Sequence, residues 1–365
     1  MIDSKALVNL LSKNKIDNYV GVPDSILKNF LTYLDKKNYN NIIACNEGSA
    51  VGIAIGQYLS SKKVSLVYMQ NSGIANAINP LISIAHPKVY SVPMILLIGW
   101  RGHDAKDEPQ HNLKGLITKK LLKVLNIDYC ELTEPEDFKS IKKLITKSKK
   151  QNTPVAILIK KTDVFKKEII KRYNKNKILR SQVIEKLLEK IKKKTKIVST
   201  TGYTSRELFQ IRSNKKTTIG QDFYMVGGMG HATSVSTGVA LNTKEQVICL
   251  DGDGSLIMHL GSLITAGSSN RKNFKHILLN NGAHESVGGQ KIKTEQINFK
   301  SIVKTFGYKN FYIIRNKAEL DKYLPIFLKS IGPSFMQIQI KDGSLKNLTR
   351  PKNFIQIKKR FIFNK

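Results

Sequence analysis

The sequence predicts an α/β protein made of two doubly wound, mostly parallel sheets. Short apolar runs alternate with stretches of helical periodicity, which is typical of parallel strands covered by helices on both faces. This alternation stops in a polar, basic stretch and then restarts. The chain has 365 residues, and a single hydrophobic core stops growing at roughly 250 residues, so two domains are expected.

We expect the first domain at 1–165, a basic linker at 166–180 and the second domain at 181–365. The opening residues form an amphipathic helical pattern and lack the unbroken apolar run of a secretory signal. In the first domain, strands are expected at 18–22, 41–44, 64–69, 94–98 and 156–160, and helices at 25–36, 49–61, 71–84 and 136–149. In the second, strands are expected at 197–200, 246–250, 276–280 and 336–340, and helices at 204–211, 232–241, 255–269 and 318–330.

The formal charge of +34 suggests nucleic acid as a partner. However, lysine is spread along the whole chain, and the most basic stretch, 166–196, lacks the interleaved aromatic residues that stack on bases. A basic surface that favours anionic ligands is the preferred interpretation, and a nucleic-acid-binding protein is a remote alternative. No apolar run of about 18 residues predicts a membrane span.

The three cysteines, Cys45, Cys130 and Cys249, are scattered without a CxxC spacing. This pattern favours a reducing, cytoplasmic location and argues against a structural zinc site.

A phosphate and metal site is expected between Gly252 and Asn281. The expected strand 246–250 runs into Asp251-Gly252-Asp253-Gly254-Ser255 and then into a helix, whose first N–H groups suit a phosphate. The next strand ends in Asn280-Asn281, and parallel neighbours place both loops at one carboxyl edge. Oxygen ligands of these kinds suit Mg²⁺. Alone, the first motif would be explained by a tight turn between strand and helix, and the second by a hairpin or loop. A dinucleotide fingerprint is not present, because Ile257 stands where its third glycine would be.

A second candidate is Glu47, which follows the expected strand 41–44 and opens a helix of small residues. In isolation, the alternative explanation is a carboxylate that merely complements a helix N-terminus.

Together these motifs resemble the thiamine-diphosphate-dependent enzymes, in which GDG is followed by NN. The resemblance implies that Glu47 activates the pyrimidine ring of the cofactor and that Met229 supports its bent conformation, although core packing would also explain a methionine here. It implies Mg²⁺ ligation by Asp253, the Asn281 side chain and the Ala283 carbonyl. The further cofactor contacts that it implies are Thr201, Gly228, Gly252, Gly254 and Ser255.

Local strings narrow the resemblance to the phosphonopyruvate decarboxylase family, a carboxy-lyase group with the pyrimidine-type domain first and no middle domain. They stand at 21–25, 99–102, 107–111, 200–208 and 280–290. Three positions depart from the family pattern: Tyr203 replaces an expected lysine, Gly228 an expected serine, and Val287 the usual acid.

This resemblance implies decarboxylation of 3-phosphonopyruvate to phosphonoacetaldehyde and CO₂ in phosphonate biosynthesis. Proton transfer is expected from Asp24, His111 or Glu285. A substrate with two negative charges needs a cation, for which Arg101 is the first candidate, together with Ser25 and His284. Lys114 and Arg206 are weaker candidates, since surface cations are common on so basic a chain.

The resemblance also implies a homo-oligomer, at least a dimer, with active sites shared between subunits. Three alternatives remain at this point: sulfopyruvate decarboxylase, a thiamine-dependent carboligase and, remotely, the nucleic-acid-binding protein.

Overall fold

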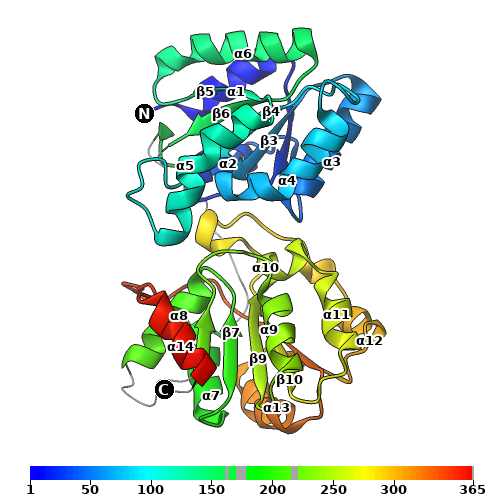
Figure 1. Ribbon diagram of the computed structural model, residues 1–365, viewed down its shortest axis with the longest axis vertical. Helices are drawn as coiled ribbons and strands as arrows, with labels where there is room; N and C mark the ends of the chain where they lie inside the picture. Colours follow the sequence, from blue (N-terminus) through cyan, green and yellow to red (C-terminus); the bar gives the residue numbers. More distant parts are fainter. Residues whose placement is uncertain (161–163, 170–177, 215–220, 364–365) are drawn as a thin grey trace. The chain divides into compact units, whose positions relative to one another are not determined.

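The computed structural model describes residues 1–160, 164–169, 178–214 and 221–363. The chain divides into two compact units: Met1–Lys171 with His284–Gln290, and Arg172–Ala283 with Lys291–Lys365. Each unit contains one six-stranded sheet (Figure 1). The expected linker at 166–180 falls partly on 170–177, which lie outside the described residues.

The first sheet has the strand order β2-β1-β3-β4-β6-β5, and every neighbouring pair is parallel. Its strands are β1 (Asn18–Gly21), β2 (Asn41–Ile43), β3 (Ser65–Gln70), β4 (Ile95–Gly99), β5 (Asp128–Glu131) and β6 (Val155–Ile159). The helices are α1 (Ser4–Lys13), α2 (Lys28–Lys36), α3 (Glu47–Ser61), α4 (Ile74–Pro80), α5 (Pro109–Val124) and α6 (Phe138–Gln151).

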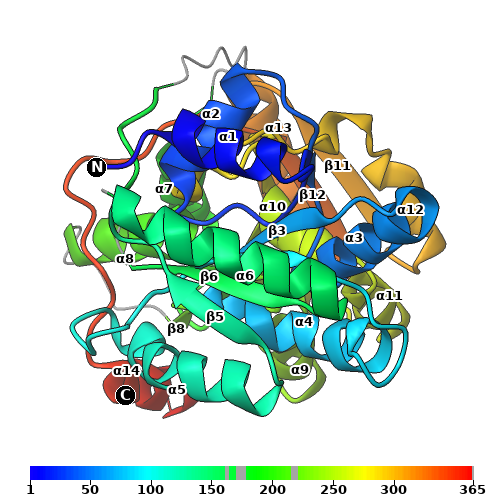
Figure 2. The same ribbon diagram turned by 90° about the horizontal axis from the view of Figure 1, so that it is seen from above.

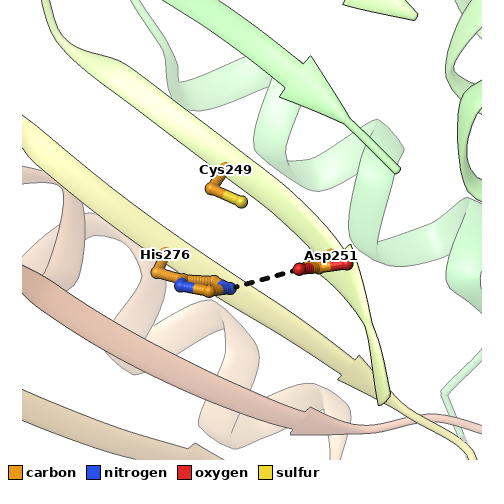
Figure 3. A group of neighbouring side chains, drawn as sticks. All are labelled: Cys249, Asp251 and His276. Carbon is orange, nitrogen blue, oxygen red and sulfur yellow. Dashed lines mark ion pairs between the residues drawn. The ribbon is translucent and has the colours of Figure 1, made fainter. Parts of the chain in front are cut away.

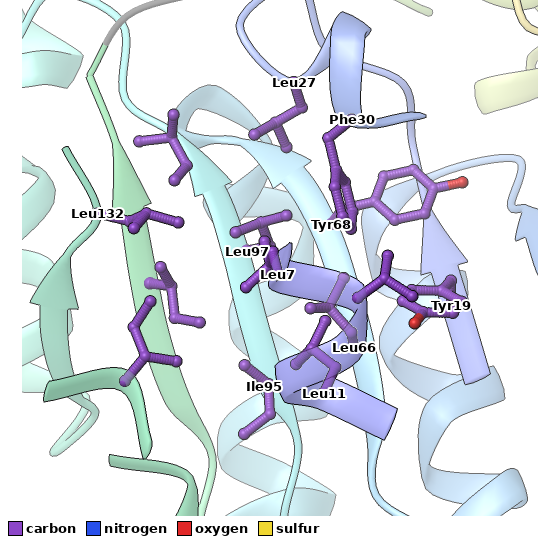
Figure 4. Packing of buried hydrophobic residues seen from close by; sticks show 14 of the residues in the cluster. Leu7, Leu11, Tyr19, Leu27, Phe30, Leu66, Tyr68, Ile95, Leu97 and Leu132 are labelled. Atoms are coloured by element: carbon purple, nitrogen blue, oxygen red, sulfur yellow. The ribbon is translucent and has the colours of Figure 1, made fainter. Parts of the chain in front are cut away.

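Helices cover both faces of this sheet because its central strands are apolar on both sides. The core under α1, α2 and α6 includes Leu7 and Leu11, which lie over Leu66 and Leu97 of the sheet (Figure 4). On the same face, α6 crosses β5 and β6 (Figure 2). Apolar residues of α3, α4 and α5 fill the opposite face.

The second sheet has the order β11-β12-β10-β9-β7-β8 and is also wholly parallel. Its strands are β7 (Lys196–Ser199), β8 (Gln221–Tyr224), β9 (Val247–Gly252), β10 (Phe274–Asn280), β11 (Asn310–Ile314) and β12 (Ser334–Gln339). The helices are α7 (Arg180–Lys190), α8 (Tyr203–Asn214), α9 (Ala232–Leu241), α10 (Asp253–Met258), α11 (Ser262–Ser268), α12 (Phe299–Thr305), α13 (Lys317–Lys329) and α14 (Phe354–Phe363).

Two apolar layers likewise enclose this sheet. Helices α7, α8 and α13 pack on one face, and α9 to α12 on the other. The predicted fold class is therefore confirmed. Among the described helices, none is long and apolar enough to cross a membrane.

The sequence pattern missed several elements for a common physical reason. Strands β5, β8 and β11 all lie at a sheet edge, and β5 and β8 contain polar or charged residues in place of a long apolar run. The sequence pattern also missed four helices. Helix α5 has a mixed polar and apolar pattern, and the other three, α7, α12 and α14, are short.

Two expected helices are interrupted. The helix expected at 255–269 is divided into α10 and α11, which are separated at His259–Gly261. The helix expected at 71–84 is a 3₁₀ turn at Asn71–Gly73, then α4, then a π-helical turn at Leu81–Ala85. The first interruption contains a glycine, and Pro80 lies at the second. Both residues weaken a regular helix.

The two strand orders decide where the functional loops lie. In the first sheet the order reverses between β1 and β3, and in the second between β7 and β9. Ligands of open α/β sheets bind at the carboxyl ends of the strands beside such a reversal. The segments that follow β1, β2, β3 and β4 thus share one edge, and those after β7, β9, β10 and β12 share another.

Candidate active site

Glu47 is the first residue of α3, directly after the loop that follows β2. Asn46 caps this helix, because its side chain accepts a hydrogen bond from the Ser49 N–H at 2.8 Å. The Glu47 side chain is buried, with 5% exposed. Asn76 of α4 donates to its Oε2 atom at 2.8 Å. The structure thus holds one oxygen of this carboxylate in a fixed position.

Asp24 lies in the segment after β1 and is 1% exposed. Its Oδ1 accepts from the Ile26 N–H at 2.9 Å, and its Oδ2 from Gln70 Nε2 at 2.6 Å. Burial raises the pKa of Asp24, although these hydrogen bonds lower it. A Cβ on Gly99 would lie 2.0 Å from Oδ1, so β4 also encloses this carboxyl group.

Arg101, after β4, is bound by an acid that sequence reasoning did not pair with it. Its Nε and Nη2 atoms both donate to the carboxylate of Asp107, and Nη1 donates to Ser25 Oγ at 3.4 Å. Burial alone would raise the pKa of Asp107, but the hydrogen bonds and charge of Arg101 hold it well below its usual range. This pairing neutralises much of the Arg101 charge and leaves Nη1 directed toward Ser25.

Helix α5 carries two more of the expected residues, His111 and Lys114, both half-buried. Burial lowers the pKa of Lys114, while the charge of Glu47 raises it. Lys114 is therefore a cation within electrostatic reach of the Glu47 carboxylate.

Asp253 is the first residue of α10, immediately after β9. It is 3% exposed, and its Oδ2 accepts from the Gly282 N–H at 2.7 Å and from Thr294 Oγ1 at 3.3 Å. Oδ1 accepts from the Gly254 N–H at 2.9 Å. Burial raises the pKa of Asp253 to about 6, although these hydrogen bonds lower it. An ionised carboxylate in such a place is stabilised by a cation.

Asn281 follows β10 on the neighbouring strand. Its Nδ2 donates to Asp342 Oδ1 at 3.1 Å, and its Oδ1 accepts from the Ala283 N–H at 3.2 Å. The turn from Asn280 to Ala283 is joined to Asp253 through Gly282, as described above. A carboxylate, an amide oxygen and a nearby backbone carbonyl are oxygen donors of the kinds that Mg²⁺ prefers, so these residues fit the expected metal.

Ser255 joins three segments at the same edge. Its Oγ accepts from Thr200 Oγ1 at 2.8 Å and from the Gly230 N–H at 3.1 Å. A Cβ on Gly230 would lie 2.5 Å from the His259 ring, so only glycine fits there. The Ser255 hydroxyl therefore holds the glycine-rich segment in place, in addition to the cofactor contact that we expected.

The remaining expected cofactor residues lie in these same segments. Thr201 is in the turn between β7 and α8, and Met229 is half-buried in the segment before α9. Gly228 is exposed and has a φ of +65°, a conformation that glycine adopts without strain. Gly252 is the N-cap residue of α10.

His284 and Glu285 begin a short closed loop. The His284 N–H donates to the Gln290 carbonyl at 2.9 Å, and the bridge between Ala283 and Lys291 closes the base of the loop. His284 is 6% exposed, whereas Glu285 is half-buried. The loop therefore presents Glu285 more openly than its neighbour.

A separate buried cluster lies further back along β9 and β10. Cys249, Asp251 and His276 place ligand atoms within 4.8 Å of one another (Figure 3). Burial raises the pKa of Cys249 well above its usual value and that of Asp251 to about 6, and it lowers that of His276 to about 3. Burial thus favours the uncharged form of each group. The cysteine pattern in the sequence did not indicate this cluster, because its members meet only through strand pairing.

Sequence reasoning also missed several residues that hold the expected ones in place: Gln70, Asn76, Asp107, Thr294 and Asp342. Most of these residues are distant in sequence from the side chains that they contact, or belong to no recognised motif. A single sequence therefore does not indicate their role. Asp107 is the exception, because it stands in a string that the family resemblance already used.

Comparison with known proteins defines the class. Residues 3–121 match the thiamine pyrophosphate enzyme, N-terminal TPP binding domain, and residues 200–338 match the corresponding C-terminal TPP binding domain. Glu47 therefore lies in the region that matches the N-terminal domain, and Asp253 and Asn281 lie in the region that matches the C-terminal domain.

The similar proteins include decarboxylases of two kinds. Phosphonopyruvate decarboxylase of Streptomyces viridochromogenes is 31% identical, with 96% of this chain and 92% of that protein covered. Sulfopyruvate decarboxylase of Methanosarcina acetivorans is 25% identical, with 97% and 95% covered. Sulfopyruvate decarboxylase subunit beta of Methanocaldococcus jannaschii is 40% identical, with 35% and 66% covered. The chain therefore belongs to the phosphonopyruvate decarboxylase family of thiamine-diphosphate-dependent enzymes, as the sequence motifs predicted.

Proposed function

We propose that this chain decarboxylates 3-phosphonopyruvate to phosphonoacetaldehyde and CO₂, with thiamine diphosphate and Mg²⁺, in phosphonate biosynthesis. The observation that carries this proposal is likeness to phosphonopyruvate decarboxylase over nearly the whole of both chains, with both halves of the site intact. When bound, thiamine diphosphate supplies the electron sink for the electron pair that the departing carboxylate leaves behind.

Residues of the chain bind the cofactor and the metal. Glu47 would contact the pyrimidine ring of the cofactor and exchange a proton with it. Asp253, the Asn281 amide oxygen and the Ala283 carbonyl would hold Mg²⁺, and the buried setting of Asp253 strengthens its attraction for a cation. The N–H groups at the start of α10 face the same edge and suit a phosphate.

We propose that Arg101 and Ser25 bind the phosphonate, with His284 as a further donor. The Nη1 contact between Arg101 and Ser25 supports this, because it places two donors side by side. Since Asp107 neutralises much of the Arg101 charge, a substrate with two negative charges needs a second cation. Lys114 suits this role, because its ammonium is partly buried and so incompletely solvated.

For proton transfer we propose His111 and Glu285 ahead of Asp24. Both are half-buried, whereas Asp24 is nearly enclosed and both of its oxygens already accept hydrogen bonds from the protein. A buried carboxyl of this kind is better suited to fixing the segment after β1.

We further propose a homo-oligomer, at least a dimer, in which Glu47 of one subunit and Asp253 of another serve one cofactor. Co-expression of Glu47→Gln and Asp253→Ala chains tests this. A shared site leaves one intact site in each mixed dimer, so about a quarter of wild-type activity returns. A monomer in sedimentation, or no recovery, would refute the shared site. The scattered free cysteines support a cytoplasmic location.

Sulfopyruvate decarboxylase is the second candidate, because one such enzyme matches 97% of the chain. A sulfonate carries one negative charge less than a fully ionised phosphonate, so the two substrates differ in how much cation they require. A carboligase, which adds an acceptor aldehyde or oxo acid, remains the third candidate.

The decisive experiment compares CO₂ release from phosphonopyruvate, sulfopyruvate and pyruvate by the protein loaded with thiamine diphosphate and Mg²⁺. We expect the highest kcat/KM for phosphonopyruvate and an aldehyde in amounts equal to the CO₂. Preference for sulfopyruvate, turnover of pyruvate alone, or a ligated product would contradict the proposal.

Glu47→Gln is the matched control, since it keeps the size of the side chain and removes its acid. We expect it to retain cofactor binding and lose nearly all turnover. Full activity in this variant would refute the role of Glu47.

A further inference from the structure

We infer that Asn76 is the residue that positions the activating glutamate, and that Oε1 of Glu47, not Oε2, is the atom that serves the cofactor. This inference rests on the proposed function of the Glu47 half-site. It concerns three side-by-side features of the first unit: an amide donor on α4 and two glycines that bring it and the carboxylate into place.

The two oxygens of Glu47 have different surroundings. Oε2 accepts a hydrogen bond from Asn76 Nδ2 at 2.8 Å. Within the described part of the chain, no residue donates a hydrogen bond to Oε1. A carboxylate oxygen normally accepts a hydrogen bond from the protein, from water or from a ligand. Oε1 is therefore the atom left to bind a ligand N–H.

Gly73 lies directly against the carboxylate of Glu47. A Cβ at this position would lie 2.3 Å from Oε1 and 2.5 Å from both Cδ and Cγ of Glu47. Gly73 is buried and immediately precedes α4, the helix that carries Asn76. The same turn thus limits where the carboxylate can lie, and the next residues supply the donor that fixes its rotation.

Gly48 brings the two helices together. A Cβ on Gly48 would lie 2.8 Å from the backbone oxygen of Asn76, so any larger residue would push α4 away from α3. The closeness of the two helix starts is therefore a requirement for the hydrogen bond between Asn76 and Glu47.

Helix α5 brings a positive charge near this pair, because Lys114 interacts electrostatically with Glu47. An ammonium attracts the carboxylate as a whole and does not distinguish its two oxygens. Asn76 makes that distinction, because its hydrogen bond is directional.

The test measures the rate of proton exchange at C2 of bound thiamine diphosphate. Quenched-flow NMR gives this rate, in the absence of any oxo acid. This readout measures cofactor activation independently of the substrate. Cofactor affinity, from titration calorimetry, gives a second readout. The variants are Asn76→Ala and Asn76→Asp, with Asn79→Ala as the control on the same helix.

We expect the exchange rate to fall roughly 10- to 100-fold in both Asn76 variants, as for loss of a group that orients a reacting atom. Cofactor affinity should change less than tenfold in the same variants, and Asn79→Ala should behave as wild type. Asn76 is exposed, so the variants should keep their fold. Asn76→Asp preserves the shape of the side chain but replaces the donor to Oε2 with an acceptor, so it removes the hydrogen bond without leaving a cavity.

Wild-type exchange in Asn76→Asp, or an equal loss in Asn79→Ala, would overturn the inference. Fast exchange in the wild type without release of CO₂ from any oxo acid would instead refute the proposed function and leave the role of Asn76 standing.

Discussion

The contact between Gly73 and Glu47 gives a sharp prediction about catalysis. In Gly73→Ala the new Cβ would lie 2.3 Å from Oε1. Since non-bonded heavy atoms settle at about 3.5 Å, the carboxylate must move by roughly 1 Å. A displacement of this size at a reacting group lowers the rate by about 100-fold.

The backbone of Gly73 does not oppose the substitution. Its φ is −78° and its ψ is −14°, a helical conformation that alanine adopts readily. The effect of Gly73→Ala should therefore appear in kcat and not in folding. Steady-state decarboxylation assays and thermal unfolding of the same samples measure the two quantities.

Gly56→Ala is the matched control, because it lies in α3 and an added Cβ meets nothing within 4 Å. It should keep full activity and gain about 0.5–1 kcal/mol in stability, as for glycine replaced inside a helix. If Gly73→Ala retained wild-type kcat, Glu47 would not require the position that the structure gives it, and the reasoning would fail.

Three further predictions concern charge and stability. Asp253→Asn should weaken Mg²⁺ binding by at least about 100-fold, because it removes the charge of the ligand. The metal-free variant should be as stable as the metal-free wild type, since burial already raises the pKa of Asp253 to about 6 and so disfavours its charged form. Mn²⁺ binding by EPR and thermal unfolding measure these two effects, and unchanged metal affinity would contradict the metal role. Lys275 is buried, which lowers its pKa to about 8, so between pH 8 and about 10.4 the unfolded chain binds more protons. Stability should therefore rise by about 2 kcal/mol from pH 7.5 to 9.5, and urea unfolding of Lys275→Met should lack that rise. Asp222→Asn should cost about 3–5 kcal/mol by leaving Arg212 without its buried carboxylate partner; a loss below 1 kcal/mol in urea unfolding would show that the pair contributes little.

The sequence by itself determined the class of fold and the chemistry. Central parallel strands are covered on both faces, so they appear in the sequence as continuous apolar runs. The motifs around Asp253, Asn281 and Glu47 are each formed by neighbouring residues. These are short stretches in which the expected ligand-binding residues stand at the end of a strand or in the loop after it. The family, the cofactor and the expected reaction class could be predicted for that reason.

Only the tertiary structure decided which partner each functional side chain has. Asn76 meets Glu47 because α4 packs against α3, and Asp342 meets Asn281 because β12 lies beside β10. The cluster of Cys249, Asp251 and His276 likewise forms through strand register.

The physical reason is the distance in sequence between the residues that interact. A motif is a run of neighbouring residues, whereas orientation of a carboxylate or an amide depends on hydrogen bonds between segments that the chain brings together only when it folds. The sequence therefore predicted Glu47 as the activating acid, and the structure shows which of its two oxygens accepts the hydrogen bond from Asn76.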